Sequence, residues 1–130
     1  MDAPVTGFSH VQLNVSDVPA SEAWYSAVLG LSRLTAADDG SYVALRHRPS
    51  KTVVVLTRAA EGAAAGAGPL DHLAFAVPDG PTLRAWAAEL AAVGGYDMVH
   101  GGVVDELGKP SLSLRDPDGI VVELVAPPGS

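Results

Sequence analysis

The sequence repeats itself at an offset of 62 residues, and this repeat restricts the chain to folds built from two copies of one unit. The matched identities are His10 with His72, Val15 with Val77, Asp17 with Asp79, Pro19 with Pro81, Ala23 with Ala85 and Trp24 with Trp86. Chance rarely aligns two tryptophans with a proline, an aspartate and a histidine in the same order. We therefore expect two homologous modules.

Each copy predicts a strand, a helix and three further strands. In the first copy these are Phe8–Val15, a helix ending at Gly30, then Ser32–Ala36, Ser41–Arg46 and Thr52–Thr57. In the second they are Leu70–Val77, a helix ending at Gly94-Gly95, then Asp97–Gly101, Ser111–Arg115 and Ile120–Val125. We expect a single domain, 1–130, with module 1 at about 6–58, a small-residue linker at about 59–69 and module 2 at about 70–127.

Composition excludes several classes of function. The chain has 130 residues and no cysteine, which excludes disulfides, thiolate metal sites and thiol nucleophiles. A net charge of -7 with scattered basic residues disfavours binding to nucleic acid or to an anionic membrane. No apolar run approaches the roughly 18 residues of a membrane helix, and the N-terminus lacks the pattern of a secretory signal. These features predict a soluble, cytoplasmic protein.

Alternation along the strands separates an apolar face from a polar face. Val11, Leu13 and Val15 share the face that a helix must cover, whereas His10, Gln12 and Asn14 share the other. The same parity places His72, Ala74 and Ala76 together, as well as Tyr42, Ala44 and Arg46, and Ser111, Ser113 and Arg115. A surface with this many polar groups predicts a pocket.

The repeat places His10 and His72 at equivalent positions on equivalent strands. Imidazole is a common ligand of divalent metals, and a carboxylate on a nearby strand would complete the set. Glu123 is the candidate, because an unpaired carboxylate in its apolar strand would be costly to bury. The alternatives are an exposed edge strand that leaves Glu123 in water, and histidines that are hydrogen-bonded core residues.

Other polar residues are candidates for binding substrate. Gln12, Asn14, Tyr42, Ser111 and Ser113 could orient a substrate through neutral hydrogen bonds. Arg46 and Arg115 would favour an anionic group, and their alternative is surface solubility. The segment Gly101–Pro110 is either a flexible lid or a plain connector. For His47 and His100, an exposed structural position is the interpretation we favour.

At these residues the chain resembles the vicinal oxygen chelate superfamily, which includes glyoxalase I, extradiol dioxygenases, fosfomycin-modifying transferases and bleomycin-binding resistance proteins. The resemblance covers nearly the whole chain and rests on Phe8–Val15, Trp24-Tyr25 with Leu29–Leu31, Leu70–Phe75 and Asp116–Leu124. It implies an α+β fold of tandem βαβββ modules, with a cupped mixed sheet around a metal or ligand cavity, usually in a homodimer. It also implies that His10, His72 and Glu123 are the metal ligands.

Two departures limit which member the chain is expected to match. Glyoxalase I and related epimerases add a Glu or Gln ligand at the position where we place Val55, so their chemistry is disfavoured. Fosfomycin-modifying enzymes carry a threonine where this chain has Gln12. The remaining set of two histidines and one carboxylate suits Fe(II) or Mn(II), with Zn(II) or Ni(II) possible.

The resulting hypothesis is a metal-dependent dioxygenase-, lyase- or transferase-like enzyme whose small, oxygenated and possibly anionic substrate is chelated through adjacent oxygens. The alternative is a non-catalytic resistance protein that sequesters an antibiotic or toxin, as bleomycin-binding proteins do with the same fold.

Overall fold

The computed structural model describes residues 3–4, 6–60, 65–66, 68 and 70–130. The chain divides into two compact units, Met1–Ala65 (unit 1) and Gly66–Ser130 (unit 2), each described below by itself. The linker predicted at about 59–69 lies partly outside the described residues.

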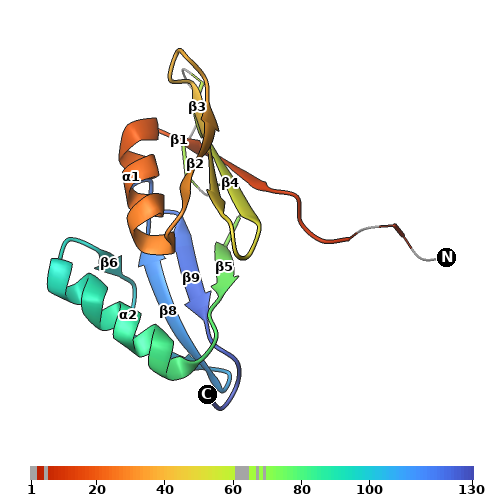
Figure 1. Cartoon of the computed structure of the whole chain (residues 1–130). Helices are drawn as coiled ribbons and strands as arrows, with labels where there is room; N and C mark the ends of the chain where they lie inside the picture. Colours follow the sequence, from red (N-terminus) through yellow and green to blue (C-terminus); the bar gives the residue numbers. More distant parts are fainter. Residues whose placement is uncertain (1–2, 5, 61–64, 67, 69) are drawn as a thin grey trace. The chain divides into compact units, whose positions relative to one another are not determined.

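Unit 1 has one helix and four strands. These are β1 (Val11–Val15), α1 (Val18–Leu29), β2 (Ser32–Ala36), β3 (Tyr42–His47) and β4 (Thr52–Arg58). The sheet order is β1-β4-β3-β2, with β1 parallel to β4 and the other neighbours antiparallel. Residues 6–10, which precede β1, extend away from this sheet (Figure 1).

Unit 2 repeats this arrangement and adds one short strand. Its elements are β5 (His72–Ala76), α2 (Gly80–Val93), β6 (Asp97–Met98), β7 (Val104–Glu106), β8 (Lys109–Arg115) and β9 (Val121–Val125). The order β5-β9-β8-β6 corresponds strand for strand to that of unit 1, and β5 is parallel to β9. The predicted α+β class and the two βαβββ modules are confirmed.

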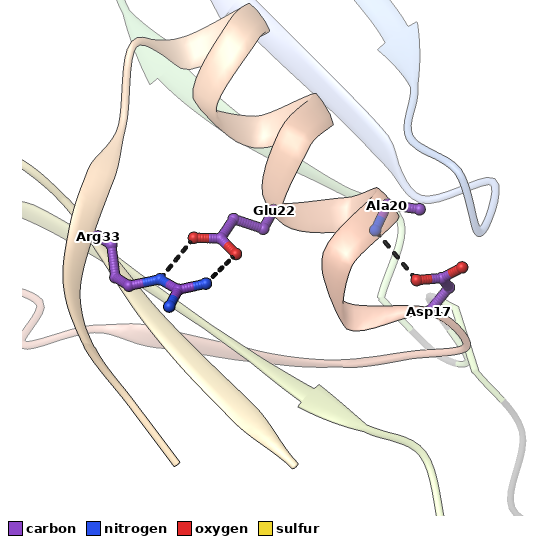
Figure 2. Close-up of polar contacts among 4 residues, drawn as sticks. All are labelled: Asp17, Ala20, Glu22 and Arg33. Carbon is purple, nitrogen blue, oxygen red and sulfur yellow. Dashed lines mark hydrogen bonds and ion pairs between the residues drawn. The ribbon is translucent and has the colours of Figure 1, made fainter. Parts of the chain in front are cut away.

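Both helices begin at an aspartate cap and end at a glycine. The Asp17 side chain accepts a hydrogen bond from the Ala20 backbone N–H at 3.0 Å (Figure 2), and Asp79 accepts one from Thr82 at 2.8 Å. Gly30 ends α1 with φ 68°, a left-handed conformation that glycine adopts without strain. Neither helix of the described part of the chain is long and apolar enough to cross a bilayer.

An ion pair joins the edge strand of unit 1 to its helix. The Arg33 guanidinium on β2 donates to both carboxylate oxygens of Glu22 on α1, at 2.6 and 2.9 Å (Figure 2). This hydrogen bond is the main reason that the pKa of Glu22 lies below its ordinary value. The paired geometry places Arg33 on the helix-covered face of the sheet.

Each module buries the apolar face of its sheet. In unit 1, α1 packs on β3 and β4, and in unit 2, α2 packs on β8. The buried residues of unit 2 include Leu83, Leu90, Leu112, Leu114, Val122 and Leu124, and those of unit 1 include Tyr25, Val28, Val43, Leu45, Val54 and Leu56. Because side chains alternate along a strand, the opposite face of each sheet carries the polar residues.

A tight turn sets the register between β8 and β9. Asp116 is buried, and its carboxylate accepts hydrogen bonds from the backbone N–H groups of Asp118 and Ile120, at 2.9 and 2.8 Å. Gly119 completes the turn with φ 82°. The resulting register places Ser113 directly opposite Glu123.

The segment Gly101–Pro110, expected to be a flexible lid or a connector, contains a β-hairpin. Strand β7 pairs with the start of β8, and Glu106 is paired with Lys109. The two residues between them, Leu107 and Gly108, have φ values of 52° and 78°. Two positive φ values are typical of a type I′ turn, which prefers Asn-Gly or Asp-Gly and rarely contains leucine.

Leu107→Asn should therefore raise the free energy of unfolding by about 0.5–1 kcal/mol, because asparagine adopts the left-handed conformation with less strain than leucine. Urea denaturation measures the change. Leu107→Ala is the matched control, since it removes the exposed side chain but keeps the strain. Equal stability of the asparagine and alanine variants would contradict this prediction.

Candidate metal and substrate site

The open face of the unit 2 sheet brings together two of the three predicted metal ligands. In the parallel pairing of β5 with β9, His72 lies opposite Val121 and Ala74 lies opposite Glu123. The side chains of His72 and Glu123 therefore project from neighbouring strands on the face away from α2. His10, the third predicted ligand, belongs to unit 1 and is the last residue before β1.

A cavity of about 620 Å³ lies on this face of unit 2. Its polar lining consists of His72, Glu106, Lys109, Ser111 and Glu123. Its apolar lining consists of Ala74, Phe75, Ala76, Val77, Leu107, Val125, Ala126, Pro127 and Pro128. The volume and the mixture of lining groups are typical of a site for a small molecule.

The His72 ring is held by the residue before it. Its Nδ1 lies 2.6 Å from the Asp71 carboxylate, which can only accept a hydrogen bond when ionised. The proton of a neutral His72 ring therefore lies on Nδ1, and the lone pair lies on Nε2. This carboxylate–histidine arrangement is the one that orients metal-binding histidines.

The His72–Asp71 hydrogen bond also raises the pKa of His72 above its ordinary value. Desolvation acts in the opposite direction, and the negative charges of Glu123, Asp71 and Glu106 add to the increase. The negative charge of Glu123, on the neighbouring strand, thus favours the protonated form of the ring.

His10 has a related local arrangement. Its Nδ1 lies 3.0 Å from the Ser9 hydroxyl oxygen, so both repeat-equivalent histidines contact the side chain of the preceding residue through the same ring nitrogen. His10 itself is exposed in the structure.

The Glu123 carboxylate is half-buried in the open face. Ser113, on the neighbouring strand, donates its hydroxyl to Glu123 Oε2 at 3.4 Å. The alternative of an exposed edge strand does not apply, because β9 lies between β5 and β8. A neutral imidazole and an oriented carboxylate have the donor chemistry that Mn(II), Fe(II) and Zn(II) accept.

Within the described residues, no group of three or more His, Cys, Asp or Glu side chains is arranged to hold a metal ion. The His72–Glu123 pair is thus the part of the predicted ligand set that unit 2 contains by itself.

The register also identifies the residue of unit 1 that corresponds to Glu123. In unit 2, Glu123 pairs with the residue two positions after His72, and in unit 1 the residue two positions after His10 is Gln12, which pairs with Val55. Unit 1 therefore has valine where unit 2 has its carboxylate. This is the residue that the sequence analysis placed at the missing fourth ligand.

The residues predicted to bind substrate have different environments. Ser111 lines the cavity and donates to the Lys109 carbonyl at 3.4 Å, whereas Arg115 lies outside the lining and binds Asp97 at 3.2 Å. In unit 1, Gln12 donates to the Thr57 hydroxyl at 2.9 Å, Asn14 and Tyr42 are exposed, and Arg46 is half-buried.

The two spare histidines lie outside the cavity lining. His47 Nδ1 lies 2.8 Å from the Ser50 hydroxyl in the turn after β3, and His100 is exposed.

Sequence reasoning missed the residues that the β7–β8 hairpin contributes to the cavity. Glu106, Leu107 and Lys109 all line it. Two short segments of alternating polar and apolar residues on either side of Leu107-Gly108 could have indicated the hairpin. The dipeptide Leu-Gly, however, is a poor match to the Asn-Gly or Asp-Gly of the usual hairpin turn.

Asp71→Asn should lower the pKa of His72 towards its ordinary value, because an amide carries no negative charge. The raised pKa means that protonated His72 stabilises the fold below its ordinary pKa, and this contribution disappears as the pH rises through the folded-state value. NMR titration of the His72 imidazole measures the change. Asp105→Asn, which removes a carboxylate from β7 in the same unit, is the control, and an unchanged His72 titration in Asp71→Asn would contradict the assignment.

Comparison with known proteins gives one family. Residues 7–124 match the model of the Glyoxalase/Bleomycin resistance protein/Dioxygenase superfamily. No curated protein matches the chain.

Solved structures with the same fold cover nearly the whole chain. A glyoxalase/dioxygenase from Nostoc punctiforme has 25% identity and a TM-score of 0.76, covering 98% of this chain and 97% of its own. A lactoylglutathione lyase from Agrobacterium tumefaciens has 22% identity and a TM-score of 0.76, covering 95% and 96%. A fosfomycin resistance protein from Listeria monocytogenes, in complex with Mn(II) and a dihydroxypropylphosphonic acid, has 16% identity and a TM-score of 0.74, covering 94% and 92%.

Proposed function

The chain belongs to the Glyoxalase/Bleomycin resistance protein/Dioxygenase superfamily, and from this membership we propose that it is a divalent-metal-dependent enzyme acting on a small oxygenated molecule. The observation that carries the proposal is the position of His72 and Glu123 on one face of one cavity, with the ring nitrogen of His72 oriented by Asp71. In the neutral ring, the Nδ1 contact with Asp71 leaves the Nε2 lone pair free for a metal, and the Glu123 carboxylate offers oxygen donors beside it.

In this proposal His72, Glu123 and His10 hold the metal, and Fe(II) or Mn(II) suits the donor set better than Zn(II) or Ni(II). Mn(II) is also the ion in the Listeria monocytogenes structure, whose likeness to this chain is one of fold. A bound divalent metal would act as a Lewis acid towards substrate oxygens.

The residues of the chain bind and orient the substrate around that centre. Lys109 supplies hydrogen-bond donors at the cavity wall, the Ser111 hydroxyl oxygen can accept a hydrogen bond, and Ser113 keeps the Glu123 carboxylate in place. The hairpin residue Leu107 and the two prolines that follow β9, Pro127 and Pro128, form an apolar wall of the cavity. Gln12, Asn14 and Tyr42 remain candidates for neutral contacts in unit 1.

The reaction class we favour is dioxygenase-, lyase- or transferase-like. A glyoxalase I reaction is disfavoured, because it needs an acid–base side chain at the position of Val55, and valine cannot carry a proton.

The metal can be tested by elemental analysis of protein purified without added metal. We expect close to one equivalent of iron or manganese in the wild type. His72→Ala, Glu123→Gln and His10→Ala should each weaken metal binding by at least about 100-fold, because changes of outer-shell residues alone cost 10–100-fold.

His47→Ala and His100→Ala are matched controls that remove an imidazole from each unit outside the proposed ligand set, and both should retain the metal. Wild-type protein that binds none of the four candidate metals would refute the proposal, as would equal metal loss in all five variants.

The second candidate is a binding protein that sequesters an antibiotic or toxin. The observation in its favour is that nine of the fourteen cavity-lining residues are apolar. Its test is calorimetric titration of metal-free protein with bleomycin. Tight binding by a protein that takes up no metal would favour sequestration over catalysis.

The homodimer and the cytoplasmic location stay predictions. Sedimentation equilibrium tests the homodimer.

A further inference from the structure

The two modules carry an arginine at the same position of the sheet. Arg46 on β3 pairs with Val53, and Arg115 on β8 pairs with Val121. Val53 lies two residues before Val55 in β4, and Val121 lies two residues before Glu123 in β9. Val55 and Glu123 are the equivalent positions identified above. The two arginines are therefore repeat equivalents, and alternation places each on the open face of its own sheet.

The neighbour on the next strand differs between the modules. Arg115 has Asp97 as its register partner, and the two side chains form an ion pair at 3.2 Å. Arg46 has Ser32 as its register partner, and the Ser32 hydroxyl donates to the Arg46 backbone carbonyl at 3.3 Å. A hydroxyl that donates to the backbone does not neutralise the guanidinium. The charge of Arg115 is therefore balanced by Asp97, whereas no residue that the structure describes forms an ion pair with Arg46.

The Arg46 side chain is also less exposed than its counterpart. It is half-buried, whereas Arg115 is exposed. Arg46 Nε is buried and has no hydrogen-bond partner among the residues that the structure describes. A buried Nε–H that has lost its contact with water requires an acceptor.

Three acidic residues of unit 1 bind groups other than Arg46. Glu22 binds Arg33, Asp17 caps α1, and Asp39 accepts from the Ser41 backbone N–H at 2.9 Å. No ion pair to Arg46 occurs in the described part of the chain. Within β1, β2, β3 and β4, Arg46 is the only charged side chain on the open face, since Arg33 lies on the helix side with Glu22.

We propose that Arg46 binds the anionic group of the substrate, a carboxylate or phosphonate, and that its repeat equivalent Arg115 has a structural role. The inference rests on the proposed function, because it assumes a small substrate with an oxyanion. A planar guanidinium offers two parallel N–H donors to such a group, and this geometry distinguishes it from a lysine. The selection between two equivalent arginines follows from the difference between Ser32 and Asp97 and from the deeper burial of Arg46.

The test is an NMR titration of the arginine Nε–H signals of the full chain, freed of metal by a chelator. The probes are methylphosphonate, acetate and the neutral ester dimethyl methylphosphonate. We expect methylphosphonate or acetate to shift the Arg46 signal saturably with a Kd of about 1–10 mM, the range of a weak single-group contact. The Arg115 signal and the neutral ester titration should show no saturable shift.

Arg46→Lys, which keeps the charge but loses the planar fork, should weaken binding of the preferred anion about 10-fold, measured by the backbone amide shifts of β3 and β4. Arg115→Gln should leave the Arg46 titration within twofold of the wild type. The amide spectra of both variants report directly whether the fold is retained. The preference between methylphosphonate and acetate identifies the class of anion.

Absence of a saturable Arg46 shift with both anions would overturn the inference, as would equal shifts of Arg46 and Arg115 or an equal response to the neutral ester. Metal content separates this result from the proposed function. If the protein binds metal but neither anion shifts the Arg46 Nε–H signal, only the anion site is refuted. If the protein binds no metal but an anion shifts the Arg46 Nε–H signal saturably, the proposal of a metal-dependent enzyme is refuted and the oxyanion site is supported.

Discussion

Each module depends on the parallel pairing of its first strand with its last. β1 pairs with β4 and β5 pairs with β9, which requires the chain to cross over before it returns, through a helix and two strands in unit 1 and through a helix and three strands in unit 2. In unit 2 this backbone ladder places His72 and Glu123 on neighbouring strands although they are far apart in the sequence. The candidate site therefore follows from the pairing, and its geometry would be lost with a shift of one residue, which would turn Glu123 to the helix side.

The polar face persists because the other face of the same sheet is well buried. Leu112, Leu114, Val122 and Leu124 are buried on the helix side, and their burial stabilises strands whose opposite face carries a half-buried carboxylate. The cost of that carboxylate is reduced by its hydrogen bond from Ser113. The site is thus supported by the core of the module and by few polar contacts of its own.

The two modules share a backbone plan but differ in where they place charge. Unit 2 has Glu123 where unit 1 has Val55, and it has Asp97 where unit 1 has Ser32. Unit 2 therefore has acidic groups near its histidine and a neutralised arginine, whereas unit 1 has an arginine without an acidic partner among the described residues. The duplicated fold allows this because a side chain on the open face can change without disturbing the buried face.

The sequence by itself determined the repeat, the order of the elements, the helix ends and the turn at Asp116–Gly119, because these depend on local patterns: alternation, capping residues and glycine. It also indicated which residues share a strand face. The β7–β8 hairpin was missed because Leu107-Gly108 stores strain that only the surrounding strand pairs hold in place. The tertiary structure alone decided that Arg115 binds Asp97 while Arg46 has no such partner in the described part of the chain. Those contacts depend on the register between strands, which joins residues distant in sequence and leaves no periodic signal along the chain.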